Sequence, residues 1–306
     1  MRVSLVVTAL NESAHAGRLI AAIAAQTRRP DEIVFVDGGS TDATLDVVTR
    51  AAAEAGLPLR TALRPGNISA GRNHGVSLAS GEVVAVTDAD CVPEPAWLER
   101  LVAPFADPAV VAVGGAYVPL AATAWAKVVA AYSWVPTRAG QRRFLPSHRS
   151  VAYRKTLWQA LGGYDESLGT AEDTAFDLAV ERAGGWRIAA DAVVAWPPRA
   201  TLGAAMRQQF RYGAGDGRAG IQLGYHAAVG AVCGLELALI AARGRARWTA
   251  LGLWTLAAAP FAARYVEAFG PSARGLAGVA VALGALAPAR LAGFLRGVSE
   301  ARTRRP

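Results

Sequence analysis

Two aspartates that follow an apolar run offer the clearest chemistry in this sequence. Residues 83–86 read Val-Val-Ala-Val, and Asp88 and Asp90 come shortly after them with one residue between. In an extended backbone, side chains at i and i+2 leave on the same side, and ligands of open α/β sheets bind at the carboxyl ends of strands. Two such carboxylates suit a hard divalent cation, which in turn binds phosphate oxygens. An Asp-rich turn after a strand would show the same pattern, so the other motifs must decide.

Three further clusters carry functional groups. The pair Glu172-Asp173 follows Gly169-Thr170 at the expected start of a helix, where acids often only complement the helix dipole but could also act as a general base. The Gly-rich segment 65–75 contains Arg72, which could reach a phosphate or a base edge. Gln208 and Arg211 share one helix face at i, i+3, a pattern that a solvated or membrane-flanking basic helix would also show.

The elements that must position these residues alternate between strand and helix over residues 1–90. Strands are expected at residues 3–8, 32–37, 58–63 and 82–87. Ser13, Asp42 and Ser69 are suited to cap the three helices between them. Such alternation predicts a parallel sheet with helices on both faces, and the polar loops after its strands would share one edge, where a nucleotide would lie. Residues 91–200 are less regular, with a helix expected at 172–183 and another at 202–213.

Composition separates several classes of protein. The 306 residues carry a net charge of +8, yet no Lys/Arg run with interleaved aromatic residues suggests a nucleic-acid surface. Arginines instead border apolar segments at 243–247 and 302–305, a pattern typical of a cytoplasmic membrane face. The two cysteines are far apart, so no disulfide framework is implied. The N-terminus leads directly into a strand pattern, so no signal peptide is expected.

Three apolar stretches follow residue 220, at about 225–242, 248–266 and 275–295. A membrane-spanning helix needs about 20 apolar residues, and the second and third stretches approach that length. The flanking arginines place both outer ends of these two stretches inside, with residues 267–274 as the outer turn. The first stretch is basic at both ends and is expected to lie in the interface or to re-enter. A buried helical hairpin packed on the preceding domain is the alternative.

The order of the motifs resembles a family-2 glycosyltransferase with the GT-A fold over residues 3–215. Residues 3–12 are similar to its opening strand with Asn-Glu, and residues 34–42 to its nucleotide-binding turn, with Gly38 in place of a frequent Asp. Residues 71–75 resemble its Ala-Arg-Asn-x-Gly, residues 87–90 its Asp-x-Asp, and residues 162–165 with 172–173 its Gly-Gly-Phe-Asp and Glu-Asp. Residues 208–212 resemble Gln-x-x-Arg-Trp, although Tyr212 replaces Trp and weakens any inference of processive polymer synthesis.

The resemblance implies a fold and a domain division. The fold would be α/β of the GT-A type, with a mostly parallel sheet flanked by helices and C-terminal apolar helices after it. Residues 1–218 would form the catalytic domain, with a nucleotide-binding half at about 1–90 and an acceptor half at about 91–218. Residues 219–306 would form a membrane-associated helical region.

The resemblance also implies roles for single residues. The nucleoside pocket would be lined by Thr8, Asn11, Glu12 and Asp37, with Arg72 near the base or diphosphate and Asp88 facing the ribose or sugar. Asp90 would hold Mg²⁺ or Mn²⁺. Asp173 would be the general base, supported by Glu172, while Gln208 and Arg211 would close over the diphosphate or acceptor. Arg149 could contact an anionic acceptor, and His148 is expected to be a structural neighbour.

The function implied is an inverting, metal-dependent transfer of a sugar from a nucleotide-diphosphate sugar to an acceptor hydroxyl. Lipid-linked and cell-envelope glycans are candidate acceptors, and nucleic acid is not an expected partner. The enzyme would sit at the inner membrane with its catalytic domain in the cytoplasm. Two alternatives stay open. A sugar-1-phosphate nucleotidyltransferase should carry a Gly-rich loop after its first strand, and residues 8–13 contain no glycine. A membrane scaffold with an inactive transferase domain would not need Asp90 and Asp173.

Overall fold

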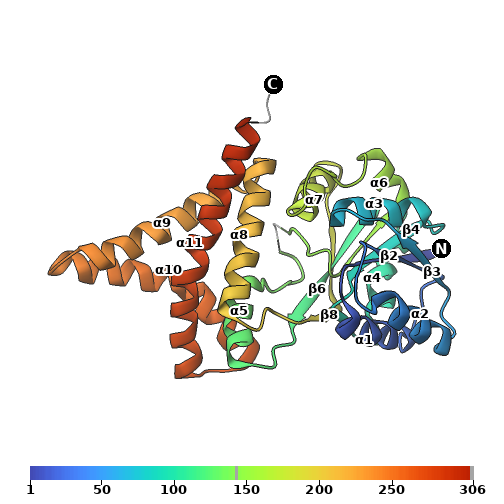
Figure 1. The fold of residues 1–306 in the computed structure, drawn as a ribbon, viewed down its shortest axis with the longest axis horizontal. Coiled ribbons are helices and arrows are strands. Elements are labelled where there is room, and N and C mark those ends of the chain that lie inside the picture. The colour runs from blue at the N-terminus through green and yellow to red at the C-terminus, as the bar shows by residue number, and fades with distance from the viewer. Residues whose placement is uncertain (142–143, 304–306) are drawn as a thin grey trace. The chain divides into compact units, whose positions relative to one another are not determined.

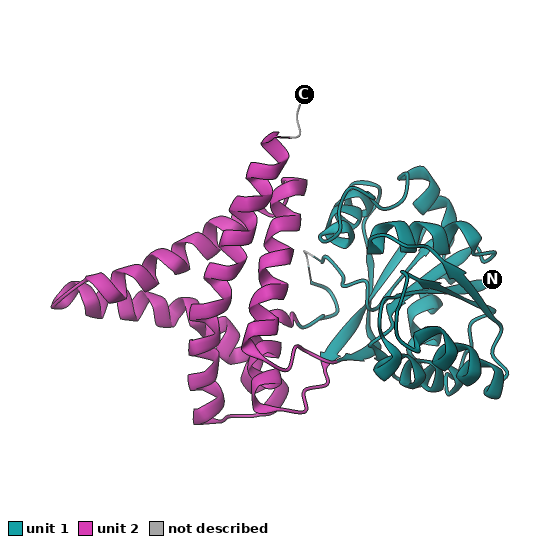
Figure 2. Cartoon of the chain, viewed as in Figure 1, with its two compact units in different colours: residues 1–118, 136–196 teal, residues 119–135, 197–306 magenta. Residues whose placement is uncertain are grey.

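A computed structural model describes residues 1–141 and 144–303, so Arg304 and Arg305 of the predicted basic flank lie outside the described residues. The chain divides into two compact units (Figure 2). Unit 1 comprises Met1–Val118 and Pro136–Trp196, and unit 2 comprises Pro119–Val135 and Pro197–Pro306. The predicted boundary after residue 218 differs from this division, because helix α8 (Leu202–Ala219) packs along helix α11 (Ala273–Thr303) inside unit 2.

Unit 1 is built on one eight-stranded sheet (Figure 1) with the order β3-β2-β1-β4-β7-β6-β8-β5. The strands are β1 Val3–Ala9, β2 Glu32–Asp37, β3 Leu59–Leu63, β4 Val83–Asp88, β5 Val92–Pro93, β6 Ala112–Pro119, β7 Val151–Arg154 and β8 Arg187–Trp196. The first four strands in this order are parallel, whereas β7 is antiparallel to both β4 and β6. The sheet is therefore mixed, as expected for a GT-A fold, and its parallel strands are those of residues 1–90.

The parallel strands bring the predicted polar loops to one edge. Residues of β1, β2 and β4 are apolar and buried on both faces, as expected for strands covered by helices on either side. Thr8 pairs in register with Asp88, and Ala9 pairs with Asp37. The carboxyl ends of three strands therefore meet at the same place, as the strand–helix alternation predicted.

Helices cover this sheet, and the one that matters most for function is α3 (Ile68–Leu78). The helices of unit 1 are α1 Ser13–Ala24, α2 Thr44–Glu54, α3, α4 Trp97–Val102, α6 Lys155–Ala160 and α7 Glu172–Arg182, with a 3₁₀ turn at Ala103–Ala106. A Cβ added at Gly75 would lie 2.6 Å from Val6 Cγ1, so this glycine lets α3 pack close to the sheet. The N-cap of α3 is Asn67, whose Oδ1 accepts from the backbone N–H of Ala70 at 3.0 Å.

None of the three predicted helix caps is the N-cap residue of its helix, and the N-cap of α2 is Ala43. Ser69 lies inside α3 and donates its hydroxyl to the carbonyl oxygen of Leu168, because Asn67 already caps the helix. Ser13 is the first residue of α1 rather than its cap. Asp42, the third predicted cap, binds the backbone N–H of Thr44 at the start of α2 and also that of Ser13, so one carboxylate serves two helix starts.

Unit 2 consists of helices only among its described residues. They are α5 Ala124–Ser133, α8, α9 Leu223–Ala241, α10 Arg245–Phe269 and α11. The α8–α11 pair is held by facing glycines at spacing i, i+4. A Cβ added at Gly213 or Gly217 of α8 would lie 2.1 Å or 2.3 Å from a carbonyl oxygen of α11. Added at Gly293 or Gly297 of α11, it would lie 2.0 Å or 2.2 Å from a carbonyl oxygen of α8. The two backbones therefore touch directly, as in small-xxx-small helix pairs.

This close contact predicts a stability defect from one methyl group. Gly213→Ala should lower the free energy of unfolding by about 1–3 kcal/mol, because the helices must separate to admit the Cβ. Gly230→Ala in α9 is the matched control, since nothing lies within 4 Å of its added Cβ. That variant should be neutral or gain up to about 1 kcal/mol from helix propensity. Denaturant unfolding of the purified protein measures both, and an equally stable Gly213 variant would contradict the packing.

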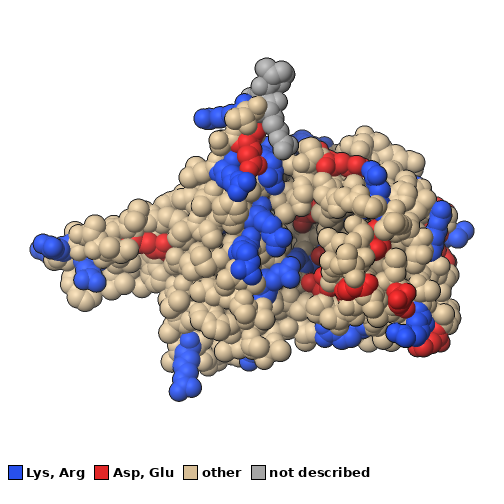
Figure 3. Space-filling view, viewed as in Figure 1, with Lys and Arg blue, Asp and Glu red and all other residues tan. Residues whose placement is uncertain are grey.

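Two described helices, α9 and α11, are long and apolar enough to cross a membrane by length and composition. The prediction named the second and third apolar stretches, but α10 does not qualify, because Trp, Thr, Pro260 and Arg264 interrupt its apolar residues. Only 11% of the α9 window is buried, against 39% of the α11 window. Figure 3 shows the α9–α10 hairpin almost free of charge, apart from basic side chains at its tip and an acidic patch midway.

Candidate active site

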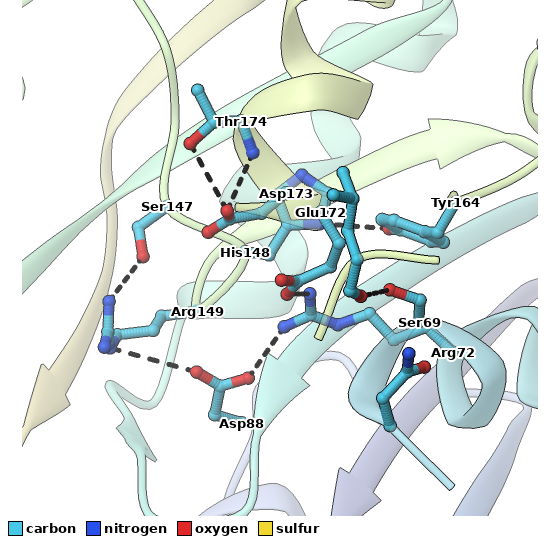
Figure 4. Close-up of polar contacts among 12 residues, drawn as sticks. Ser69, Arg72, Asp88, Ser147, His148, Arg149, Tyr164, Glu172, Asp173 and Thr174 are labelled. Atoms are coloured by element: carbon cyan, nitrogen blue, oxygen red, sulfur yellow. Dashed lines mark hydrogen bonds and ion pairs between the residues drawn. The ribbon is translucent and has the colours of Figure 1, made fainter. Parts of the chain in front are cut away.

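The candidate site lies in unit 1, where the ends of β1, β2 and β4 meet the start of α7. Arg72 on α3 is its central residue (Figure 4). The guanidinium group is 3% exposed and contacts two carboxylates: Nη1 donates to Glu172 Oε1 at 2.7 Å and Nη2 donates to Asp88 Oδ1 at 3.1 Å. One cation thus joins the end of β4 to the first residue of α7, which are 84 positions apart in sequence (172 − 88).

The charge of Arg72 is secured by these partners. Burial acts to lower the pKa of the guanidinium, but Glu172 and Asp88 outweigh it and raise the pKa above its ordinary value. Its Nε is buried and makes no hydrogen bond among the described residues. The guanidinium also lies over the ring of Tyr164, 5.6 Å from the centroid. Arg72 is therefore a fixed positive charge beside the two aspartates of the Asp-x-Asp motif.

The two acids at the start of α7 have different environments. Glu172 is buried, and burial together with Asp173 raises its pKa to about 7, partly offset by Arg72. Asp173 is half-buried, and its Oδ1 accepts from the Thr174 backbone N–H at 2.7 Å, whereas its Oδ2 has no hydrogen-bond donor among the described residues. Ala171 before them has φ +68°, a left-handed conformation uncommon for a residue with a Cβ. The accessible acid is Asp173, and the buried acid Glu172 holds Arg72.

The residues after β4 fit a divalent cation. Ligand atoms of Asp88, Asp90 and Cys91 lie within 4.8 Å of one another. Burial, with Asp88 and Asp90 nearby, raises the pKa of the Cys91 thiol well above its ordinary value, and its Sγ donates to Asp90 Oδ1 at 3.6 Å. The two aspartates offer the carboxylate oxygens that Mg²⁺ and Mn²⁺ prefer as ligands.

The predicted nucleoside-pocket residues surround the ends of β1 and β2. Asn11 has φ +56°, and its Oδ1 accepts from the backbone N–H of Thr41 at 2.9 Å. Glu12 Oε2 pairs with His15 Nδ1 at 2.7 Å. Thr8 is half-buried at the end of β1. Asp37 is only 2% exposed and accepts from the backbone N–H and hydroxyl of Ser40, so it also shapes its own turn.

Arg149 belongs to this cluster and entered the sequence analysis only as a candidate acceptor contact. Its guanidinium lies 4.7 Å from the ring centroid of Trp196 and 5.4 Å from that of Tyr117, and its Nε is 3.9 Å from Asp88 Oδ2. Two arginines therefore flank Asp88. No sequence motif signals this, because Tyr117, Arg149 and Trp196 come from separate parts of the chain.

A buried polar chain lies behind the acids of α7. His148 Nε2 pairs with Asp177 Oδ1 at 2.8 Å, and its Nδ1 lies 3.0 Å from the Tyr164 hydroxyl, which lies 3.1 Å from that of Tyr153. Burial lowers the pKa of His148 and raises that of Asp177, so both favour their neutral forms. His148 is a structural neighbour, as predicted from the sequence, and Asp177 was missed because a lone Asp within a helix carries no signal.

Gln208 and Arg211 lie on α8 in unit 2, so their predicted role over the diphosphate stays a prediction. Gln208 is buried, and its Nε2 donates to the Tyr212 hydroxyl at 3.1 Å, whereas Arg211 is exposed. The neighbouring Gln209 instead joins a buried group in unit 2, accepting from Arg290 Nη1 at 3.3 Å. Arg290 also pairs with Asp216, which pairs with His226.

Known proteins resemble parts of this sequence. A curated relative from Nostoc sp., the uncharacterized glycosyltransferase alr2836, is 37% identical over 114 residues, which span 37% of this chain and 35% of the relative. Glycosyltransferase AglE of Haloferax volcanii is 25% identical over 220 residues, which span 70% of this chain and 72% of AglE. The chain thus matches about a third of the length of the first relative and most of the second.

Solved structures share the fold. A mannosyltransferase of Pyrobaculum calidifontis, PcManGT in complex with GDP-Man and Mn²⁺, superposes with a TM-score of 0.60 at 21% identity, over 98% of this chain and 87% of that one. S. aureus TarS 1–349 in complex with UDP gives 0.54 at 15% identity, over 100% and 92%. Residues 4–155 match the family model described as Glycosyl transferase family 2. Residues 4–155, about half of the chain, therefore belong to glycosyl transferase family 2, and the chain has the GT-A fold.

Proposed function

We propose that this protein is an inverting, metal-dependent glycosyltransferase that moves a sugar from a nucleotide-diphosphate sugar to an acceptor hydroxyl. The observation that carries the proposal is the Arg72 bridge, which joins Asp88 at the candidate metal site to Glu172 beside the candidate base. A transfer of this kind needs a cationic environment for the departing diphosphate and a carboxylate that accepts the proton of the acceptor. The GDP-Man and Mn²⁺ of the Pyrobaculum structure and the UDP of TarS support this choice of donor class and metal.

The donor would lie along the polar edge of the parallel strands. Thr8, Asn11, Glu12 and Asp37 would line the nucleoside pocket, and Arg72 would lie near the base or diphosphate. Asp90 would hold Mg²⁺ or Mn²⁺, with Asp88 beside it and facing the ribose or sugar. A bound divalent cation would neutralise charge on the leaving diphosphate. Gln208 and Arg211 would close over the diphosphate or acceptor.

The acceptor would be activated by Asp173. Its carboxylate is the less buried of the two acids and keeps one oxygen clear of the Thr174 hydrogen bond, so it can accept the proton of an incoming hydroxyl. In-line attack on the anomeric carbon, opposite the departing diphosphate, would invert its configuration. Glu172 would contribute indirectly by holding Arg72 in place.

We further propose that the protein works at the cytoplasmic face of a membrane and that the α9–α10 hairpin enters the bilayer. The turn at residues 267–274, predicted to be the outer turn, packs against α5: Lys127 lies over the Phe269 ring at 5.6 Å. The exposed apolar faces of α9 and α10 would then contact the lipid.

A donor screen tests the proposed function. Full-length protein in detergent is mixed with GDP- and UDP-sugars, with Mn²⁺, Mg²⁺ or a chelator, and thermal stability and nucleotide release are measured. One donor class should raise the unfolding temperature and release nucleotide only with metal. The anomeric configuration of the product, read by NMR, should be opposite to that of the donor. Nucleotide release that is unchanged by chelator, or a retained configuration, would contradict the proposal.

A further inference from the structure

Unit 2 contains a cavity of about 390 Å³ where the N-terminus of α5 meets that of α11. It is lined by Thr123, Trp125, Lys127 and Val128 from the α5 region and by Tyr265, Ser272, Arg274 and Gly275 from α10 and α11, among others. The volume is within the range of small-molecule sites. None of these residues belongs to the candidate active site, so the cavity needs its own explanation.

The charges in this cavity are uncompensated. Lys127 and Arg274 both line it, and among the described residues no carboxylate pairs with either of them. Both lie near the first turn of a helix, where the helix dipole disfavours a cation, and neither helix has an acid in its first turn. Two positively charged side chains thus lie beside two helix N-termini, whose dipoles are also positive. An anion in the cavity would be attracted by all four.

The other residues that line the cavity provide hydrogen-bond donors and an apolar surface, which suit the polar and apolar parts of a lipid. The hydroxyls of Thr123 and Ser272 accept from backbone N–H groups of their helices and keep their own protons to donate. Trp125, Val128 and Tyr265 give an apolar wall, and Trp125 is 41% exposed. Gly275 makes room for this arrangement, because a Cβ there would lie 2.1 Å from the Tyr265 ring. The cavity therefore offers a cationic end beside an apolar surface.

We propose that this cavity binds the anionic headgroup of a membrane lipid, with Lys127 and Arg274 on the headgroup and Trp125, Val128 and Tyr265 along the start of the acyl chains. The site is separate from the proposed sugar-transfer site, and the inference rests on the membrane association proposed above. It would hold the α5–α11 junction of unit 2 against the lipid surface.

The test uses full-length protein in a neutral detergent, with dioctanoyl phosphatidylglycerol, dioctanoyl phosphatidylcholine or inorganic phosphate as probes. Thermal unfolding midpoints are measured against probe concentration for the parent and for the double variant K127A/R274A. The anionic lipid should stabilise the parent at a concentration at least about tenfold lower than either other probe does. The double variant should need at least about tenfold more of it, as expected when two charge-assisted contacts are lost.

The probe-free midpoint separates this role from a structural one. Without lipid, the double variant should be as stable as the parent or more stable, because two cations leave helix N-termini. R243A/R245A is the matched control, since it removes two exposed arginines elsewhere in unit 2 and should keep the full lipid response. The proposed lipid site would be overturned if the anionic lipid raised the unfolding midpoints of the parent and of K127A/R274A equally. It would also be overturned if both lipids stabilised the parent equally. Stabilisation by inorganic phosphate at the concentration that suffices for the anionic lipid would overturn its assignment to a lipid.

Discussion

Asp173→Asn should slow sugar transfer by about 10²–10⁴-fold, the usual contribution of a general base. The amide keeps the shape of the side chain and can still accept from the Thr174 backbone N–H, which Asp173 binds at 2.7 Å, but it cannot take a proton from the acceptor. Donor and metal affinities should not change, because Asp173 is not among the residues proposed to contact the donor or the metal. Steady-state transfer rates and nucleotide titrations measure the two effects separately.

Glu172→Gln should have the smaller effect and a different pH dependence. Because burial and Asp173 raise the pKa of Glu172 to about 7, this group loses its proton as the pH rises through neutrality and then pairs fully with Arg72. If the ionised form supports catalysis, the parent rate rises across this range, and the Gln variant lacks that rise. The Asn variant at 173 should be slow at every pH.

Glu181→Gln on the exposed side of α7 is the matched control and should behave like the parent. Two results would reverse the assignment. Loss of nucleotide affinity in Asp173→Asn would place this acid in the donor pocket. A larger defect in Glu172→Gln than in Asp173→Asn would exchange the two roles.

Asp90→Ala should remove metal-dependent turnover, by about 10²-fold or more, while leaving the fold intact. A half-buried carboxylate after a strand end contributes little packing, whereas a metal that stabilises a leaving diphosphate is worth several kcal/mol in the transition state. Transfer rates at saturating donor, with a Mn²⁺ titration and a chelator control, give the measurement. Circular dichroism and thermal unfolding confirm that the variant is folded.

Cys91→Ala separates the carboxylate from its neighbour. The buried thiol lies 3.6 Å from Asp90 Oδ1, but Mg²⁺ and Mn²⁺ prefer oxygen ligands, so its removal should leave metal affinity unchanged. Near-normal turnover of Asp90→Ala at saturating donor would remove this residue from the metal role. A loss of metal affinity in Cys91→Ala would instead make the sulfur a ligand.

The sequence alone was sufficient to predict the strands of residues 1–90 and their parallel arrangement. Continuous apolar runs such as residues 83–86 are typical of strands in a sheet that helices cover on both faces. Because a helix lies between each pair of successive strands, those strands are expected to be parallel. The strands predicted at 3–8, 32–37, 58–63 and 82–87 agree with β1 to β4 within one residue at each end. The edge on which Thr8, Asp37 and Asp88 would meet followed from the same pattern.

The tertiary structure decided which of these polar residues act on one another. No local pattern shows that Arg72 joins Asp88 to Glu172, or that Glu172 is buried while Asp173 is not, because those facts depend on how α7 is packed. It also placed α8 with α11, since four glycines that read as weak helix formers allow two backbones to touch. Strands and turns follow from backbone preferences and from the periodicity of apolar residues, which are properties of short segments. Contacts between residues distant in sequence, and the burial of each side chain, are decided only when the whole chain packs.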